Sequence, residues 1–543
     1  MVPGADATIG WFTLVLAVGI ISLLILTSTV LPLRRMYDQL QQRFIFGVPW
    51  GSLVVVGILF FVYLFVQHGW WHYRRPVVVA YTAVSMYDPT GWVFAGLAHS
   101  SPGHLRANVT TTLVFAPIVE YIWGHYPRTT RRNWEPAWAQ HPIVRAVVVF
   151  PLGVLLVAII AALFSWGPVI GFSVAAFALI GCALVYYPVL AVVGLVARSA
   201  VRVLWRTVTD PVVVTETTVR TVRPDWFGTA VQGHLVGLLL GVIIGIGLLR
   251  YHRVTPAPAR VFGANLLAGF FLSVWAIWWI IGPEAFVLFR ALGVALVIGV
   301  AGLVALAVGT DHIDPVHMPR WNPATSALGI LLVAVLGMGV IGIGLNFALV
   351  ENPDHDPQLE IQDYTIMYGE DIPDGMINIV DVEAFGLTTD VRTSGVVVVS
   401  EQRNVWRQMV SSTELETHGR GHFTVGGIGW SERIIAERTG WTPVGNDTVY
   451  QIDLHSGETT IQAFESEPST ASAVIENHSI RIQIEDEAFV MAVLADDAIH
   501  TVELPNHGEN VTVNDLTITR TRNQIVAATD GSAVVVAERE TYQ

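Results

Sequence analysis

Long apolar runs in the first 350 residues constrain the fold most strongly. Crossing the roughly 30 Å hydrocarbon core of a bilayer takes about 20 helical residues. The mean hydropathy of the whole chain, +0.53, is far above that of a soluble domain. The sequence therefore predicts an all-α polytopic membrane bundle, with apolar runs near 9–33, 45–67, 104–123, 146–165, 169–186, 188–206, 228–249, 264–282, 284–309 and 325–350.

The segment 169–206 is barely long enough for two crossings. The motif "VYYP", which ends at Pro188, is the natural place for the turn because proline breaks a helix and begins the next one well. A short helix that begins inside a cavity would relieve the length problem. The following helix then carries Arg198, Arg202 and Arg206 on one face.

The pattern changes after Val350. Stretches such as "TVYQIDL", "SIRIQIED" and "SAVVVAERE" alternate apolar and polar residues between turn-forming Gly, Asn and Asp, which is typical of strands. Residues 351–543 are thus predicted to form a β-rich soluble domain. This part carries a net charge of −23, whereas residues 1–350 carry +9, so the two regions are expected to face different surroundings.

Composition excludes several classes of function. The single cysteine, Cys182, rules out an intramolecular disulfide and a cysteine zinc site, and it makes redox chemistry improbable. The sequence shows no phosphate-binding loop, and the acidic tail argues against nucleic-acid binding. "DHIDPVH" at 311–317 is interpreted as a loop between spans and "HGRGH" at 418–422 as a glycine-rich turn. No metal or cofactor is predicted.

The chain has no lysine, and Asp plus Glu outnumber Arg by 44 to 30. Strong ionic screening limits the repulsion between carboxylates, so this balance is expected of a protein from a salt-rich environment, such as that of a halophilic archaeon.

Arginine clusters orient the predicted spans. The clusters at 34–43, 128–132 and 250–253 fall on one side of a ten-span model, and the positive-inside rule makes that side cytoplasmic. Arg74 and Arg75 fall on the opposite side. The model places both termini, and with them the acidic domain, outside the cell.

Polar residues of three predicted spans then lie at a similar outer depth. His104 and Asn108 share one face of a helix, Ser173 begins a second, and His234 lies near the start of a third. A lone serine or histidine in a membrane helix is most often structural. Their combination has a chemical meaning, because a histidine base activates a serine nucleophile and fixed donors stabilise the oxyanion that results.

Gly237 and Gly241 form a small-xxx-small pattern behind His234. Such a pattern indicates first of all close packing of two helices. Close packing is also what brings a histidine against a serine on a neighbouring helix, so the structural and the catalytic interpretations agree.

Residues 45–250 resemble the rhomboid family of intramembrane serine proteases. "HSSPGHLRAN" is similar to the histidine-rich second helix of that family, "GFS" matches the start of its GxSG motif, and "HLVGLLLG" matches HxxGxxxG. The resemblance implies a six-helix core, a catalytic dyad of Ser173 and His234 without an acidic third member, and oxyanion stabilisation by His104 and Asn108. It assigns structural roles to His99, Glu120, Gly124, Gly171, Phe177, Gly181, Gly237 and Gly241.

Two positions depart from the family pattern. Val174 follows the serine where the family has glycine, and Phe177 stands where an aromatic residue, often Tyr, supports the catalytic histidine. The first departure leaves open a catalytically inactive relative.

The sequence therefore predicts four parts: an N-terminal extra span and cytoplasmic loop at 1–44, the rhomboid-like core at 45–250, additional spans at 251–350 and the acidic domain at 351–543. The predicted function is cleavage of transmembrane-helix substrates within the bilayer near its outer face. The alternative is an inactive rhomboid-like protein that binds membrane clients or presents the outer domain. The sequence indicates no oligomeric state.

Overall fold

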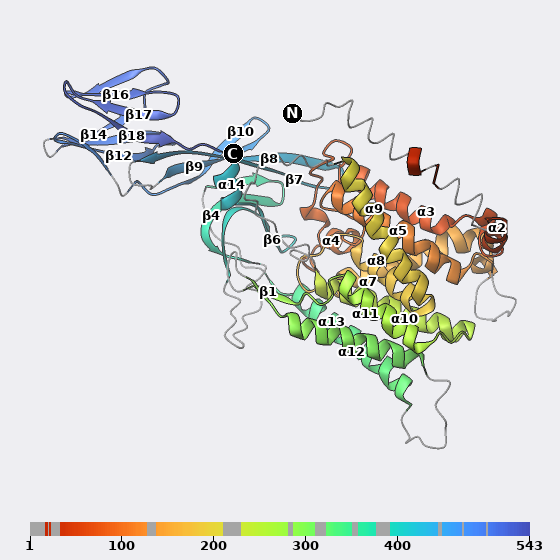
Figure 1. Cartoon of the computed structure of the whole chain (residues 1–543). Helices are drawn as coiled ribbons and strands as arrows, with labels where there is room; N and C mark the ends of the chain where they lie inside the picture. The colour runs from red at the N-terminus through yellow and green to blue at the C-terminus, as the bar shows by residue number, and fades with distance from the viewer. Residues whose placement is uncertain are drawn as a thin grey trace. The chain divides into compact units, whose positions relative to one another are not determined.

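The computed structural model describes residues 17–19, 21–22, 33–126, 137–209, 230–280, 286–309, 322–349, 357–375, 391–443, 448–469, 472–495 and 498–542. The chain divides into two compact units (Figure 1). One comprises Met1–Trp279 and Phe286–Ala348 and is helical. The other comprises Ile280–Ala285 and Leu349–Gln543 and is built of strands.

The helical unit packs its helices around α8. Helix α8 contacts α10 most extensively and also α5, α7, α9 and α11. It lies in the middle of this unit in Figure 1. The helices that carry the argument are α2 (Leu33–Gln41), α3 (Trp50–Phe61), α4 (Pro89–Phe94), α5 (Pro102–Trp123), α7 (Phe150–Leu163), α8 (Ser173–Tyr186), α9 (Pro188–Thr209), α10 (Val231–His252), α11 (Pro258–Phe271), α12 (Arg290–Val308) and α13 (Pro323–Asn346).

The helices make this a multi-pass membrane protein. Five described helices have the length and apolar composition to cross a bilayer: Pro142–Leu163, Pro188–Arg206, Val231–His252, Arg290–Val308 and Pro323–Asn346. Two shorter apolar helices, Trp50–Val66 and Ser173–Tyr186, lie among them. Most of the expected run 9–33 falls outside the described residues.

The prediction of a helix over 264–282 is wrong at its C-terminal end. Helix α11 ends at Phe271, and Ser273 adopts a left-handed backbone conformation with φ of 55°. The chain then forms the short strands β1 (Trp278–Ile280) and β2 (Phe286–Leu288), which pair with each other before α12. Aromatic and β-branched residues dominate "VWAIWWII", and such residues favour strands over helices.

Helix α8 is short and almost completely buried. Its 14 residues span about 21 Å, and every residue after Ser173 is buried. The helix ends at Tyr186 and α9 begins at Pro188, so the predicted turn at "VYYP" is confirmed. Small residues such as Ala175, Ala178 and Gly181 allow neighbouring helices to surround it on all sides.

The predicted β-rich domain is confirmed. One sheet has eight strands, in the order β10-β9-β8-β18-β17-β16-β15, with β7 paired to β8. Two four-stranded sheets have the orders β11-β12-β13-β14 and β3-β4-β5-β6. The strands are β3 (Leu359–Ile361), β4 (Tyr364–Pro373), β5 (Arg392–Ser400), β6 (Val405–Ser411), β7 (Arg420–Gly427), β8 (Trp430–Pro443), β9 (Val449–Ser456), β10 (Thr459–Glu465), β11 (Ala473–Ile475), β12 (His478–Glu485), β13 (Ala488–Ala495), β14 (Ala498–Glu503), β15 (Asn510–Val513), β16 (Leu516–Arg520), β17 (Gln524–Ala528) and β18 (Ala533–Arg539).

The paired strands of this unit are antiparallel, and alternate residues enter its cores. Trp441, Ile482 and Met491 are fully buried in the larger core, and Trp406 lies in a separate cluster with Met367. The turn predicted for "HGRGH" is confirmed only at Gly419, which ends α14 (Ser412–His418) in the left-handed conformation, because Arg420–His422 already belong to β7.

Candidate active site

Ser173 and His234 meet at the first turns of two packed helices. Ser173 is the first residue of α8, and His234 lies in the first turn of α10. The His234 Nε2 atom is 2.8 Å from the Ser173 Oγ atom, which is hydrogen-bonding distance. In this arrangement an imidazole can take the hydroxyl proton as the oxygen attacks a carbonyl.

Glycines bring α8 and α10 close enough for this bond. A Cβ atom on Gly241 would lie 1.9 Å from the Ala178 carbonyl oxygen, and one on Gly237 would lie 2.2 Å from the Val174 carbonyl oxygen. Gly181 makes the same kind of contact from α8, since its Cβ would clash with the backbone of α10. The small residues thus act as a close-packing face, as the sequence pattern indicates.

The two residues that depart from the family pattern also face α10. The side chain of Val174 lies against Gly233 and Gly237, where the absence of side chains leaves room for it. The ring of Phe177 stacks on the imidazole of His234, with 4.2 Å between ring centroids and 15° between ring planes. This stacking restricts the imidazole without any hydroxyl group.

His104 and Asn108 of α5 lie beside the backbone that leads to Ser173. A Cβ atom on Gly171 would lie 2.5 Å from the His104 Nε2 atom and 3.5 Å from the Asn108 Nδ2 atom. Asn108 is only 5% exposed, and its Nδ2 atom has no hydrogen-bond partner among the described residues. A buried unsatisfied donor costs free energy and calls for a functional explanation. Gly171, with φ of 123°, lets the His104 ring approach this backbone, since a side chain at 171 would collide with the ring.

The site is reachable from outside the protein. Ser173, His234 and His104 are each partly exposed, whereas the residues of α8 after Ser173 are buried. A partly exposed polar group at the mouth of an apolar helix fits a wet cavity better than hydrocarbon.

His99 is placed behind His104 rather than at the serine. Its ring is fully buried and meets the His104 ring edge to face, with 5.2 Å between centroids. Its backbone is fixed by Gln67, whose Oε1 accepts from the His99 N–H at 2.7 Å and whose Nε2 donates to the His99 carbonyl at 2.9 Å. Sequence analysis missed Gln67, because it lies 32 residues away in an apolar run without a motif.

Glu120 and Gly124 lie at the other end of α5. The Glu120 carboxylate accepts hydrogen bonds from the Gly51 N–H at 2.7 Å and from the Ser52 hydroxyl at 2.6 Å, and it lies 2.6 Å from the His125 Nε2 atom. Gly124 ends the helix with φ of 75°. Twelve residues separate Glu120 from Asn108, about 18 Å along a helix, so this cluster anchors α3 and does not touch the dyad.

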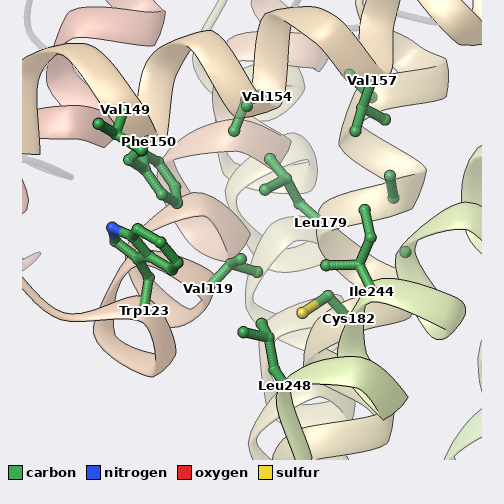
Figure 2. Close-up of a pocket in the computed structure, with 14 residues that line it drawn as sticks. Val119, Trp123, Val149, Phe150, Val154, Val157, Leu179, Cys182, Ile244 and Leu248 are labelled. Atoms are coloured by element: carbon green, nitrogen blue, oxygen red, sulfur yellow. The ribbon is translucent and has the colours of Figure 1, made fainter. Parts of the chain in front are cut away.

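An apolar cavity of about 260 Å³ lies between α5, α7, α8 and α10 (Figure 2). Val119, Phe150, Leu179 and Ile244 line it, and Cys182 directs its sulfur toward it. Neither Ser173 nor His234 is among its lining residues. No base among the described residues lines this cavity to activate the Cys182 thiol, so the candidate site is the Ser173–His234 pair.

No group of His, Cys, Asp or Glu residues in the described part of the chain is arranged to hold a metal ion. The motif at 311–317 lies outside the described residues. The residues around Ser173 instead offer a nucleophile, a base and hydrogen-bond donors.

These features define an integral membrane protein with a serine–histidine pair inside a helical bundle. Comparison with protein families supports the same class: residues 86–251 match the model of the rhomboid domain. The match extends from the loop before α4 to the end of α10 and includes every residue of the candidate site. No curated protein and no solved structure matches the chain. Residues 86–251 are thus similar to a rhomboid domain, and they lie within a multi-pass helical membrane unit.

Proposed function

We propose that the protein is an intramembrane serine endopeptidase that uses Ser173 and His234 as its catalytic dyad. The observation that carries this proposal is the 2.8 Å contact between Nε2 and Oγ, with the imidazole stacked on Phe177. The rhomboid domain match supports it, because that family consists largely of serine proteases.

The chemistry follows from the positions of the donors and acceptors. The His234 Nε2 atom takes the proton from Ser173 as Oγ bonds to the substrate carbonyl carbon. The Asn108 Nδ2 atom, His104 and the free N–H groups at the start of α8 stabilise the oxyanion. When the C–N bond breaks, the proton passes from Nε2 to the leaving amine. Water, deprotonated by the same imidazole, then attacks the acyl carbon, the C–Oγ bond breaks, and the proton returns from Nε2 to the Ser173 Oγ atom.

The substrates are transmembrane helices, cut near the outer face of the bilayer. A membrane helix satisfies its own backbone hydrogen bonds and thereby hides its peptide carbonyls. Helices with glycine, proline or other weak helix formers near that face should therefore be preferred, because they unwind at lower cost.

The orientation belongs to the same proposal. With the arginine clusters at 34–43, 128–132 and 250–253 in the cytoplasm, the acidic domain 351–543 lies outside the cell. Protease added to intact cells should remove this domain. Complete protection of the domain would refute the orientation and would move the dyad to the opposite surface.

The alternative is an inactive relative, suggested by Val174. The packing of the valine side chain against Gly233 and Gly237 argues against a steric reason for inactivity. Purified protein in liposomes should cleave members of a panel of single-span helices, and Ser173→Ala should abolish cleavage. A serine-directed fluorophosphonate should label the wild type but not Ser173→Ala. Neither cleavage nor labelling of the wild type would favour the inactive relative.

A further inference from the structure

The segment 164–172 connects α7 to Ser173. Hydrogen bonds from α10 fix the first residues of this segment. Gln232 stands two residues before His234 in the first turn of α10. Its Oε1 atom accepts a hydrogen bond from the Trp166 N–H at 3.1 Å, and its Nε2 atom donates to the Phe164 carbonyl at 3.0 Å. One side chain thus links the approach to the serine with the turn that carries the histidine.

Helix α13 holds the same segment from another side. The Trp166 indole N–H donates to the Met338 carbonyl at 2.8 Å, and the Asn346 Nδ2 atom donates to the Leu163 carbonyl at 3.2 Å. Phe164 packs directly on two glycines of α13. A Cβ atom on Gly342 would lie 2.5 Å from the Phe164 carbonyl oxygen, and one on Gly339 would lie 2.7 Å from its ring.

A third set of contacts fixes the rest of the segment. Val169 pairs with Ala83 through two backbone hydrogen bonds of 2.9 and 3.0 Å. The Met86 N–H donates to the Asn346 carbonyl at 2.8 Å, so α13 also holds the loop that pairs with Val169. Helix α13 lies outside the matched residues 86–251, and the contact between Trp166 and Met338 joins residues 172 positions apart.

We infer that α13 is a positioning element of the active site, which sets the Ser173–His234 geometry by clamping residues 163–166 against Gln232. The inference rests on the proposed protease function. Trp166, Gln232 and Asn346 are positioning residues, since they contact neither member of the dyad but hold the segments that do. Catalysis depends steeply on such placement, and an error near 1 Å can cost about 10²-fold in rate.

Two alanine substitutions on α13 form a matched pair. Gly342→Ala forces a Cβ atom against the backbone at Phe164, whereas Gly344→Ala in the same helix meets nothing within 4 Å. In proteoliposomes with a helix that the wild type cleaves, Gly342→Ala should lower kcat by about 10-fold to 10²-fold with little change in KM. Gly344→Ala should match the wild type in both constants.

A rescue experiment separates positioning from a general loss of folding. Gly339→Ala clashes with the ring of Phe164, so the double variant Gly339→Ala/Phe164→Ala should recover much of the kcat that Gly339→Ala loses. Phe164→Ala should not rescue Gly342→Ala, because that clash is with the backbone. The rate of fluorophosphonate labelling of Ser173 should follow kcat in every variant, and the melting temperature identifies any variant that unfolds.

The outcomes distinguish the two proposals. A wild type that neither cleaves nor labels overturns the protease function, and this inference with it. A wild type that cleaves while folded Gly342→Ala and Gly339→Ala retain full kcat overturns the inference alone. Rescue of Gly342→Ala by Phe164→Ala would also contradict the clamp, because relief of that clash requires the backbone to move.

Discussion

The contact between Gly241 and Ala178 allows the cost of disturbing the dyad to be worked out. A Cβ atom at 241 would lie 1.9 Å from the Ala178 carbonyl oxygen, and ordinary contact begins near 3.4 Å, so Gly241→Ala requires a displacement of about 1.5 Å between α8 and α10. The Nε2–Oγ distance of 2.8 Å can lengthen by only 0.7 Å before it exceeds the 3.5 Å limit of a hydrogen bond.

Gly241→Ala should therefore lower kcat by about 10²-fold and cost about 1–3 kcal/mol of stability, the usual range for overpacking. Gly247→Ala is the control, because it lies on the same helix with nothing within 4 Å of its Cβ position. The assays are cleavage in proteoliposomes, fluorophosphonate labelling and thermal unfolding in detergent. If Gly241→Ala is folded and cleaves as fast as Gly247→Ala, then close packing of α8 and α10 does not set the dyad.

Three further predictions follow from particular contacts. Asn108→Ala should lower turnover by about 10²–10³-fold at unchanged melting temperature, and an unchanged turnover would remove this residue from the oxyanion site. Glu120→Ala should lower the free energy of unfolding by roughly 3–5 kcal/mol, because the buried N–H groups of Gly51 and Ser52 that donate to the Glu120 carboxylate would lose their acceptor. A calorimetric loss below 1 kcal/mol would contradict this. In the β unit, burial raises the pKa of Asp363, but the hydrogen bonds and charge of Arg403 outweigh it and hold the pKa below its usual value. The stabilisation by this pair should thus be present near neutral pH and fade as the pH falls below about 4, and Asp363→Asn should weaken that acid dependence in thermal melts.

The sequence predicts the parts of the site that have a local pattern. The glycine spacing behind His234 indicates a close-packing face, and the proline at 188 marks where α9 begins. The alternation after Val350 predicts strands, and the sheets confirm them. Each of these signals arises from residues within one or two turns of each other, so no tertiary information is needed.

Other parts depend on contacts between distant residues. The Gln67 amide that fixes His99 and the α13 glycines that receive Phe164 have no spacing to their partners that a sequence pattern can reveal. Whether Val174 crowds the start of α8 also depends on its tertiary contacts. In sequence it is a bulky residue at a glycine position, but the packed helices place it opposite Gly233 and Gly237.

The shortness of α8 determines the surroundings of the site. A helix of about 21 Å cannot span a hydrocarbon core of roughly 30 Å, so one of its ends lies within the depth of the bilayer. The N–H groups in its first turn lack partners inside the helix, and several kcal/mol would be lost for each in contact with lipid. His104, Asn108 and His234 surround that end with polar atoms. The length of α8 and the polar residues of α5 and α10 therefore require each other: a serine at the start of a short helix needs a wet, polar cavity, and the proposed hydrolysis would use the same water.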